Sequence, residues 1–184
     1  MNRRRTALAL FCAACAVLWA CGSADGKKPP KYKLEGSLTE FFNFGYDEVR
    51  YESTAGAQDF AFSFIRYRGE DPDAGTPSGE DVPLKVTVRT GLLTPEQLES
   101  LDFNLAADAG NGGLDQLGVL SRNVLNDPRR SFTTLQRGSL KVNRLPAAPG
   151  ETCTGEFRAT FDPGIEYSSG RTLFGTFTAT APQP

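Results

Sequence analysis

The sequence predicts an all-β protein: a single antiparallel β-sandwich or open barrel with one short helix. Two observations support this prediction. Short segments rich in β-branched and aromatic residues recur along the chain, and Gly, Pro and Asp separate them. Helical periodicity is nearly missing, since only the stretch that begins at Thr94 has the residues of a helix start. The length suits one domain with a sizeable core, which we expect over residues 34–184.

A signal peptide and a flexible tether are predicted to precede this domain. Arg3, Arg4 and Arg5 form a positive segment, and the 15 residues that follow, 6–20, carry no charge. A secretory signal has an apolar stretch of roughly 7–15 residues, whereas a helix that spans a bilayer needs about 20. We therefore expect residues 1–20 to be a cleaved signal peptide.

The end of this segment, Leu18-Trp19-Ala20-Cys21, resembles the lipobox of bacterial lipoproteins, although Trp19 is larger than the residues usual at that position. The resemblance implies that Cys21 receives a diacylglyceryl group on its sulfur and becomes the mature, membrane-anchored N-terminus. Gly22, where many inner-membrane lipoproteins have aspartate, implies the outer membrane of the cell envelope. The alternatives are an ordinary signal cut near Ala20 or an inert N-terminal helix.

Residues 21–33 are predicted to be the lipidated cysteine and the tether. They contain Gly, Ser, Lys and the adjacent Pro29 and Pro30 but few apolar side chains, so they have no apolar face to bury. The tether would lift the domain from the bilayer, with its lysines near the lipid headgroups.

Several strands are predicted from alternation. The clearest covers residues 59–67, where Phe60, Phe62 and Phe64 share one face at period two and predict a core stripe. Residues 48–53 and 84–89 alternate in the same way. Residues 131–136 and 138–145 are predicted as two strands joined at Arg137-Gly138, and a further strand is expected from Val119 to a turn at residues 126–128.

The predicted helix has a well-defined start. Thr94 is a candidate N-cap, Pro95 occupies the first helical position, and Gln97 completes a capping box. Leu98 and Leu101 would face the body of the domain. We expect about two helical turns.

The acidic segment 69–81 contains the only candidate metal site. Carboxylates near a tight turn are the ligands that Ca²⁺ prefers, and the pattern resembles part of a calcium loop. Pro72 and Gly75 depart from the EF-hand pattern, so a solvated loop without metal is the alternative. The candidate ligands are Asp71, Asp73, Glu80 and Asp81.

The C-terminal third contains an internal echo. The hexapeptide 155–160, Gly-Glu-Phe-Arg-Ala-Thr, is nearly repeated at 175–180 as Gly-Thr-Phe-Thr-Ala-Thr. Turn residues lie between the copies, which predicts two adjacent antiparallel strands. Cys153, at the start of the first copy, is interpreted either as a small buried apolar residue or as a reactive thiol.

Composition excludes several functions. The chain has no histidine, so a Ser-His-Asp triad, a Cys-His pair and an imidazole metal site are all impossible. Removal of the three signal arginines leaves 17 of the 20 basic residues against 22 acidic ones, a net charge of −5, which does not suit nucleic acid. Cys153 would be the only thiol of the domain, which excludes an internal disulfide.

We therefore expect a non-enzymatic, membrane-anchored envelope lipoprotein without a cofactor. Its role would be structural, or it would bind a protein, glycan or lipid of the envelope. One alternative is a calcium-dependent adhesion or binding module that uses the acidic segment. The other is a carboxylate-based envelope hydrolase, which would need two acidic groups about 5–10 Å apart in a cleft.

Overall fold

The computed structural model describes residues 30–53, 59–69, 79–108, 115–129 and 131–183. They form an eight-stranded sheet in the order β6-β8-β9-β10-β3-β4-β5-β7 and a small sheet of β1 and β2. The strands are β1 (Tyr32–Lys33), β2 (Gly45–Tyr46), β3 (Glu48–Ser53), β4 (Asp59–Arg68), β5 (Gly79–Arg89), β6 (Asp102–Asn104), β7 (Gly118–Asn123), β8 (Leu135–Val142), β9 (Thr152–Phe161) and β10 (Thr172–Thr180). The helical segments are η1 (Ser37–Glu40), η2 (Thr90–Leu92) and α1 (Pro95–Ser100). The prediction of an all-β fold with one short helix is confirmed.

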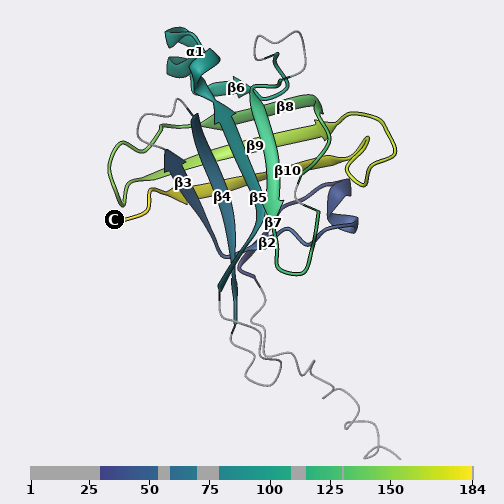
Figure 1. The fold of residues 1–184 in the computed structure, drawn as a ribbon. Helices are drawn as coiled ribbons and strands as arrows, with labels where there is room; N and C mark the ends of the chain where they lie inside the picture. The colour runs from purple at the N-terminus through teal and green to yellow at the C-terminus, as the bar shows by residue number, and fades with distance from the viewer. Residues whose placement is uncertain (1–29, 54–58, 70–78, 109–114, 130, 184) are drawn as a thin grey trace, which may run out of the picture.

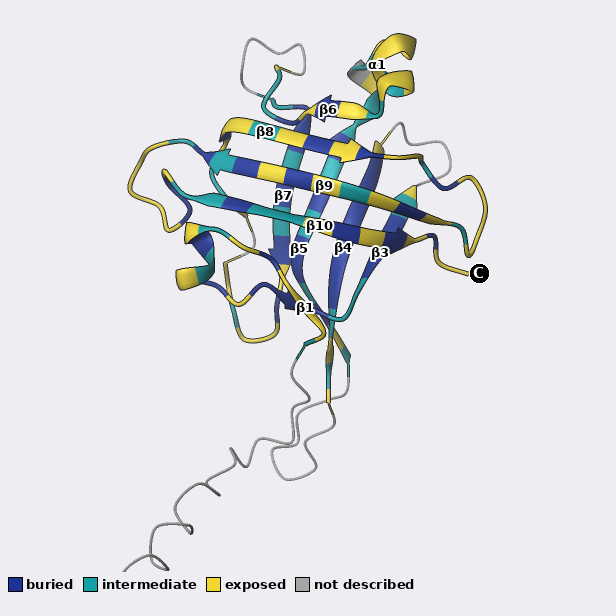
Figure 2. Cartoon of the chain, turned by 180° about the vertical axis from the view of Figure 1, so that it is seen from behind, coloured by how far each residue is buried: buried dark blue, intermediate teal, exposed yellow. Residues whose placement is uncertain are grey.

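The large sheet curls into two layers that cross each other (Figure 1). Strands β3, β4, β5 and β7 form one layer, and β8, β9 and β10 form the other. Aromatic rings fill the space between them: the ring centroids of Phe62 and Phe177 lie 4.9 Å apart, and those of Phe64 and Phe157 lie 5.7 Å apart. The phenylalanine stripe predicted on β4 is therefore a core stripe. Figure 2 shows buried and exposed residues alternating along β9 and β10, which have one face on this core.

The two ends of the sheet meet at Leu105, just after β6, and we call this junction the seam. The backbone N–H of Leu105 donates to the carbonyl of Gly138 on β8 at 2.9 Å, and its carbonyl accepts from the N–H of Gly118 on β7 at 2.8 Å. A Cβ added at Gly118 would lie 2.5 Å from the Cβ of Leu105, and one added at Gly138 would lie 2.8 Å from it. Leu105 is fully buried because both neighbours lack a side chain.

A second junction, which we call the split, lies between β10 and β3. These strands run parallel and pair only through Ala179 with Val49 and Thr180 with Arg50. The other strand pairs of the described residues are antiparallel, as predicted. No hairpin joins β10 to β3, so the connection does not fix their relative direction.

The echo places its two copies on neighbouring strands, as predicted. In the antiparallel register of β9 and β10, Gly155 lies opposite Phe177 and Gly175 lies opposite Phe157. A Cβ added at Gly155 would lie 2.6 Å from the Cζ of Phe177. Gly155 therefore leaves room for Phe177, whereas the space beside Gly175 is filled by Leu34, whose Cδ2 would lie 2.7 Å from a Cβ added there.

Helix α1 confirms the predicted start. Gln97 N–H bonds the Thr94 side chain while the Gln97 side chain accepts from Thr94 N–H, and Pro95 occupies the first turn. The helix ends at Leu101, which has a left-handed φ of 54°. The predicted strand at 48–53 is confirmed as β3.

Two predicted strand boundaries were wrong. Residues 131–136 and 138–145 are not two strands, because β8 is continuous across Arg137 and Gly138. Gly138 makes room for Leu105 and forms no turn. The strand predicted at 84–89 begins earlier, at Gly79. In addition, Tyr32 and Lys33, at the end of the segment predicted as tether, form β1 and pair with β2.

Candidate binding groove on the outer sheet face

Two adjoining hollows lie on the solvent face of β8, β9 and β10, and we call them together the outer-face groove. Their volumes are about 880 Å³ and about 600 Å³. Both are lined by Tyr32 and Tyr46 from the small sheet and by Glu156 and Thr176 from β9 and β10. The groove therefore has a floor made by the large sheet and one wall made by β1 and β2.

The floor consists of outward-facing side chains arranged in rows across three strands. Alternation along each strand directs every second side chain to solvent, and the register then places these side chains side by side. Lys141, Glu156 and Thr176 form one row, and Ser139, Arg158 and Phe174 form the next. The guanidinium of Arg158 lies over the ring of Phe174, 5.4 Å from its centroid. The floor thus combines hydroxyl, charged and aromatic groups.

The wall presents an exposed aromatic ring. Tyr32 is 57% exposed, and its ring centroid lies 5.4 Å from that of the buried Tyr46. The Tyr46 hydroxyl donates to the backbone carbonyl of Thr176 at 3.3 Å, within the stretch of β10 that has not yet reached β3. Burial, followed by the nearby Tyr32 phenol, raises the pKa of Tyr46. The Tyr46 side chain therefore lies at the split, and the exposed Tyr32 ring lines the groove.

The carboxylates that line the larger hollow lie beside hydrogen-bond donors or cations. Asp47 accepts the backbone N–H groups of Lys31 and Tyr67, at 3.3 and 2.9 Å. Glu48 forms an ion pair with Arg50. Glu156 lies opposite Lys141 across the strand pair. The larger hollow therefore carries charges of both signs along its lining.

Lys141 joins this face to the start of β6. Its ammonium lies 3.0 Å from the carboxylate of Asp102, and that contact is the main reason that the pKa of Lys141 is raised. Both side chains are largely exposed, so the pair contributes little to stability. It fixes a positive charge at the edge of the groove.

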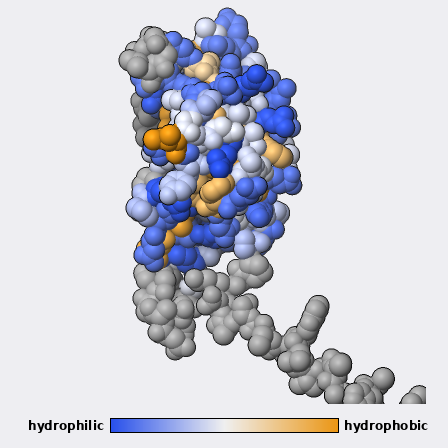
Figure 3. Space-filling model, turned by 90° about the vertical axis from the view of Figure 1, so that its right-hand side faces the viewer, coloured by the Kyte–Doolittle hydropathy of each residue, from blue (hydrophilic) through white to orange (hydrophobic). Residues whose placement is uncertain are grey.

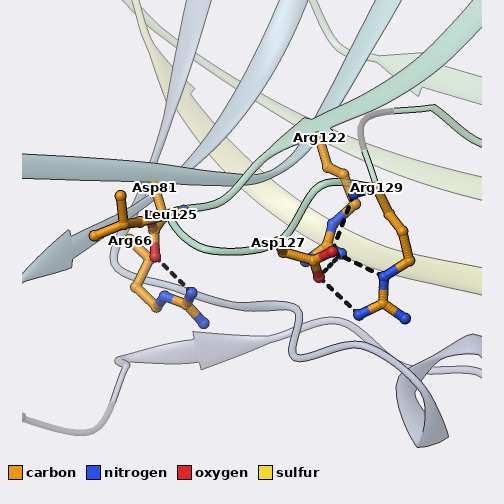
Figure 4. A network of polar contacts seen from close by, with 6 residues as sticks. All are labelled: Arg66, Asp81, Arg122, Leu125, Asp127 and Arg129. Atoms are coloured by element: carbon orange, nitrogen blue, oxygen red, sulfur yellow. Dashed lines mark hydrogen bonds and ion pairs between the residues drawn. The ribbon is translucent and has the colours of Figure 1, made fainter.

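A second polar cluster lies away from the groove (Figure 4). Asp127 binds Arg122 at 2.6 Å and Arg129 at 2.8 Å, and these bonds, led by that from Arg129, hold the pKa of Asp127 well below its usual range. Arg122 is buried, and desolvation lowers its pKa. Its guanidinium lies 4.6 Å from the ring centroid of Phe42, just after η1. This network fastens the turn after β7 to η1, and we assign it a structural role.

The candidate calcium ligands divide into two groups. Asp71 and Asp73 lie outside the described residues. Glu80 and Asp81 lie in strand β5 and not in a loop, contrary to the prediction. Glu80 binds Arg50 at 2.7 Å, and the buried Asp81 binds Arg66 at 2.7 Å and accepts the backbone N–H of Leu125 (Figure 4). Among the described residues, no three acidic or cysteine side chains are grouped so that they could hold a metal ion.

The two cysteines singled out in the sequence also differ. Cys21 lies outside the described residues. Cys153 is a free cysteine, 1% exposed, in the core opposite Ala179, and burial raises the pKa of its thiol. A buried thiol that stays protonated is a poor nucleophile. Cys153 therefore fits the interpretation as a small apolar core residue.

The sequence did not predict the groove. Its floor residues are the polar partners of the apolar positions that predicted the strands, and only the neighbour relations of β8, β9 and β10 bring them together. The echo predicted that β9 and β10 are neighbours, and this is the one part of the groove that the sequence indicated.

Comparisons with known proteins give no further assignment. No protein-family model matches the chain, and the comparisons with curated proteins and with solved structures found no match either. No helix within the described ranges has the length and apolar character needed to cross a bilayer.

Proposed function

We propose that this chain is a lipid-anchored protein of the cell envelope, attached to the outer membrane through Cys21, whose domain binds a partner without catalysis. The support for the anchor comes from the sequence: a positive segment, an uncharged stretch of signal length, and a cysteine after a small residue. Two acyl chains would hold the domain on the bilayer, since each buried methylene contributes about 0.8 kcal/mol.

The outer-face groove is the observation that supports a binding role. We infer that it accepts an extended polar chain, and that an envelope glycan fits it best. An exposed tyrosine ring can stack on the apolar face of a sugar ring, while hydroxyl and charged side chains on a flat floor can bond its hydroxyl groups. Tyr32 and the row of Lys141, Glu156 and Thr176 supply these groups at one site.

The two alternative functions have less support. A carboxylate-based hydrolase would need an acidic pair left available for catalysis, whereas Asp47, Glu48 and Glu156 each have donors or cations beside them. A calcium-dependent module would use Glu80 and Asp81, whose carboxylates bind arginines. A Ca²⁺ ion would have to displace these guanidinium groups.

The anchor is tested by mass spectrometry of protein extracted from membranes. We expect an N-terminal peptide that begins at Cys21 and carries acyl chains. A Cys21→Ser variant should lose both the acylation and the membrane fractionation. If this variant is processed and fractionates as the parent does, the proposed anchor is wrong.

The groove is tested by co-sedimentation of the unacylated Cys21→Ser chain with purified, insoluble envelope glycan. Tyr32→Ala should weaken binding about tenfold, as expected for the loss of one stacked ring, about 1.4 kcal/mol. Glu99→Ala, on the exposed side of α1, is the matched surface control and should bind as the parent does. Equal binding by the Tyr32→Ala and parent chains would contradict a glycan site in this groove.

A further inference from the structure

Exposed apolar side chains gather at one end of the barrel, where η1 lies beside the β9–β10 loop. Ile165 is 101% exposed, Tyr167 is 59% exposed, and Phe41 is 42% exposed. We call these three residues, with Arg129 and Arg171, the loop-end patch. Figure 3 shows this side of the molecule, where apolar groups lie among hydrophilic ones.

Ring contacts pair the aromatic members of the patch with its arginines and join Tyr167 to the neighbouring Phe42. The guanidinium of Arg171 lies 4.0 Å from the ring centroid of Phe41, and that of Arg129 lies 5.2 Å from that of Tyr167. The rings of Phe42 and Tyr167 are 6.5 Å apart. The aromatic side chains thus hold cations beside them while their outer edges face solvent.

The exposure of Ile165 results from an ordered loop. The N–H of Ser169 donates to the carbonyl of Glu166 at 3.0 Å, and the N–H of Thr133 donates to the Ser168 hydroxyl at 3.1 Å. Hydrogen bonds therefore hold the loop in a conformation that presents an isoleucine to water. Such an apolar group at a fixed position suits a contact surface.

We propose that the loop-end patch docks into the headgroup region of the bilayer to which Cys21 anchors the protein; this inference depends on the proposed lipid anchor. Tyrosine and arginine combine an apolar body with a polar tip and therefore suit a bilayer interface. Isoleucine and phenylalanine would enter the acyl boundary beside them.

The length of the tether supports this occupant. Pro30, the first described residue, is nine positions after Cys21, so the chain between them spans at most about 30 Å. Lys33, only three residues further, lines a hollow of about 350 Å³ together with Phe41 and Phe42. The patch therefore lies close to the end of the tether on the domain. A tether of this length keeps the effective concentration of the patch at the bilayer high.

The charges near the patch predict what kind of docking this is. Arg129 shares Asp127 with the buried Arg122, and Arg171 and Lys33 lie near Glu40 and Glu166 in the sequence-adjacent segments of the patch. Acidic side chains lie among these cations, so we assign the affinity of the patch itself to its apolar side chains. Docking should therefore occur on zwitterionic vesicles and persist in high salt.

The test uses the full chain with its lipid, reconstituted into phosphatidylcholine vesicles with and without brominated acyl chains. The only tryptophan, Trp19, lies in the predicted signal, so Ile165→Trp supplies a single reporter in the processed chain. We expect its emission to shift to the blue and to be quenched by the brominated lipid, also in 0.5 M salt. Glu99→Trp on α1, away from the patch, is the matched control and should be quenched at least about tenfold less.

The outcomes separate the two proposals. If the protein does not float with the vesicles, the anchor proposed for Cys21 is wrong. If it floats but Ile165→Trp is quenched no more than Glu99→Trp, docking is overturned, and the patch belongs to contacts with a protein. Phe41→Ser and Tyr167→Ser, added to Ile165→Trp, should reduce the quenching if docking is correct and leave it unchanged if the tryptophan alone seeks the lipid.

Discussion

The seam and the split are two junctions between strands of the curled sheet, and they differ in how the strands are held together. At the seam, Leu105 lies between Gly118 and Gly138, with backbone hydrogen bonds of 2.8 and 2.9 Å on its two sides. At the split, β10 reaches β3 over only two residue pairs, and the Tyr46 side chain bonds the backbone of β10 just before them.

This difference shows how one sheet can be closed at one edge and open at another. Glycines allow the seam to close without a gap, so its stability depends on apolar packing and backbone bonds. At the split, the Tyr46 side chain bonds Thr176 of β10, Glu35 pairs with Phe174 through two backbone hydrogen bonds, and β3 diverges from β10. The candidate groove lies beside the split, since Val49 of β3 and Thr178 of β10 both line its larger hollow.

The largest expected effect is at the seam. Leu105→Ala should lower the free energy of unfolding by about 3 kcal/mol, because it removes a fully buried side chain from a site that the surrounding strands cannot collapse into. Urea denaturation measures the change. Leu125→Ala, at an exposed leucine, is the matched control, and a loss of similar size there would mean that the seam has no special importance.

A second change tests the tightness of the seam. Gly118→Ala should cost about 2 kcal/mol, since the new Cβ would lie 2.5 Å from the Cβ of Leu105 and 3.0 Å from its Cα. Gly164→Ala is the control, because its Cβ would meet the rotatable Ser169 hydroxyl. Thermal unfolding of both variants should place Gly118→Ala well below the parent. A melting temperature equal to that of Gly164→Ala would contradict the close approach.

The Asp127 network provides a third case for comparison with the seam and the split, because it is held by charged groups and none of its residues lies at either junction. Asp127→Asn should cost about 2 kcal/mol at pH 7, as the charged bonds to Arg122 and Arg129 become neutral ones. The pKa of Asp127 is lowered by folding, so its contribution is present above its unfolded pKa of about 3.9 and is lost as the pH falls further.

Urea titrations of this variant and the parent at pH 7, 5 and 3 measure that dependence. The difference between them should shrink toward acid, whereas the deficit of Leu105→Ala should stay constant. A constant difference for Asp127→Asn would show that its bonds to the arginines do not stabilise the fold.

The smallest expected effect is at the split. Tyr46→Phe removes one hydroxyl bond to the β10 backbone and should cost about 1 kcal/mol. The pKa of Tyr46 is raised by folding, so its contribution is present below an unfolded pKa of about 10 and falls as the pH rises toward the folded value. The variant should therefore lose stability less steeply than the parent above pH 10. An unchanged alkaline profile would mean that the hydroxyl is not held in the split.

Local patterns predicted the fold class and most strands, because alternation and turn residues are properties of neighbouring positions. They did not predict the seam. Leu105 and Gly138 are far apart in sequence, and a glycine that makes room for a distant side chain looks the same as one that turns the chain. Glu80 and Asp81 were misplaced for a similar reason: their arginine partners lie on other strands.

The candidate groove was beyond local patterns for a different reason. Strand alternation predicts which side chains point outward, but a binding surface depends on which strands are neighbours. The echo revealed that β9 and β10 are adjacent, whereas nothing in the sequence indicated that β3 would join β10 or that Tyr32 would stand beside them. The anchor at Cys21 remains a prediction from the sequence alone.

The crossed arrangement of glycine and phenylalanine on β9 and β10 guards against misalignment of the nascent hairpin. A slip of two residues in one direction would set Phe157 against Phe177, and a slip in the other would set Gly155 against Gly175. The first slip would set two rings opposite each other and the second two glycines, whereas the observed register sets a glycine opposite each phenylalanine. The near-repeat thus favours the observed register over a register shifted by two residues.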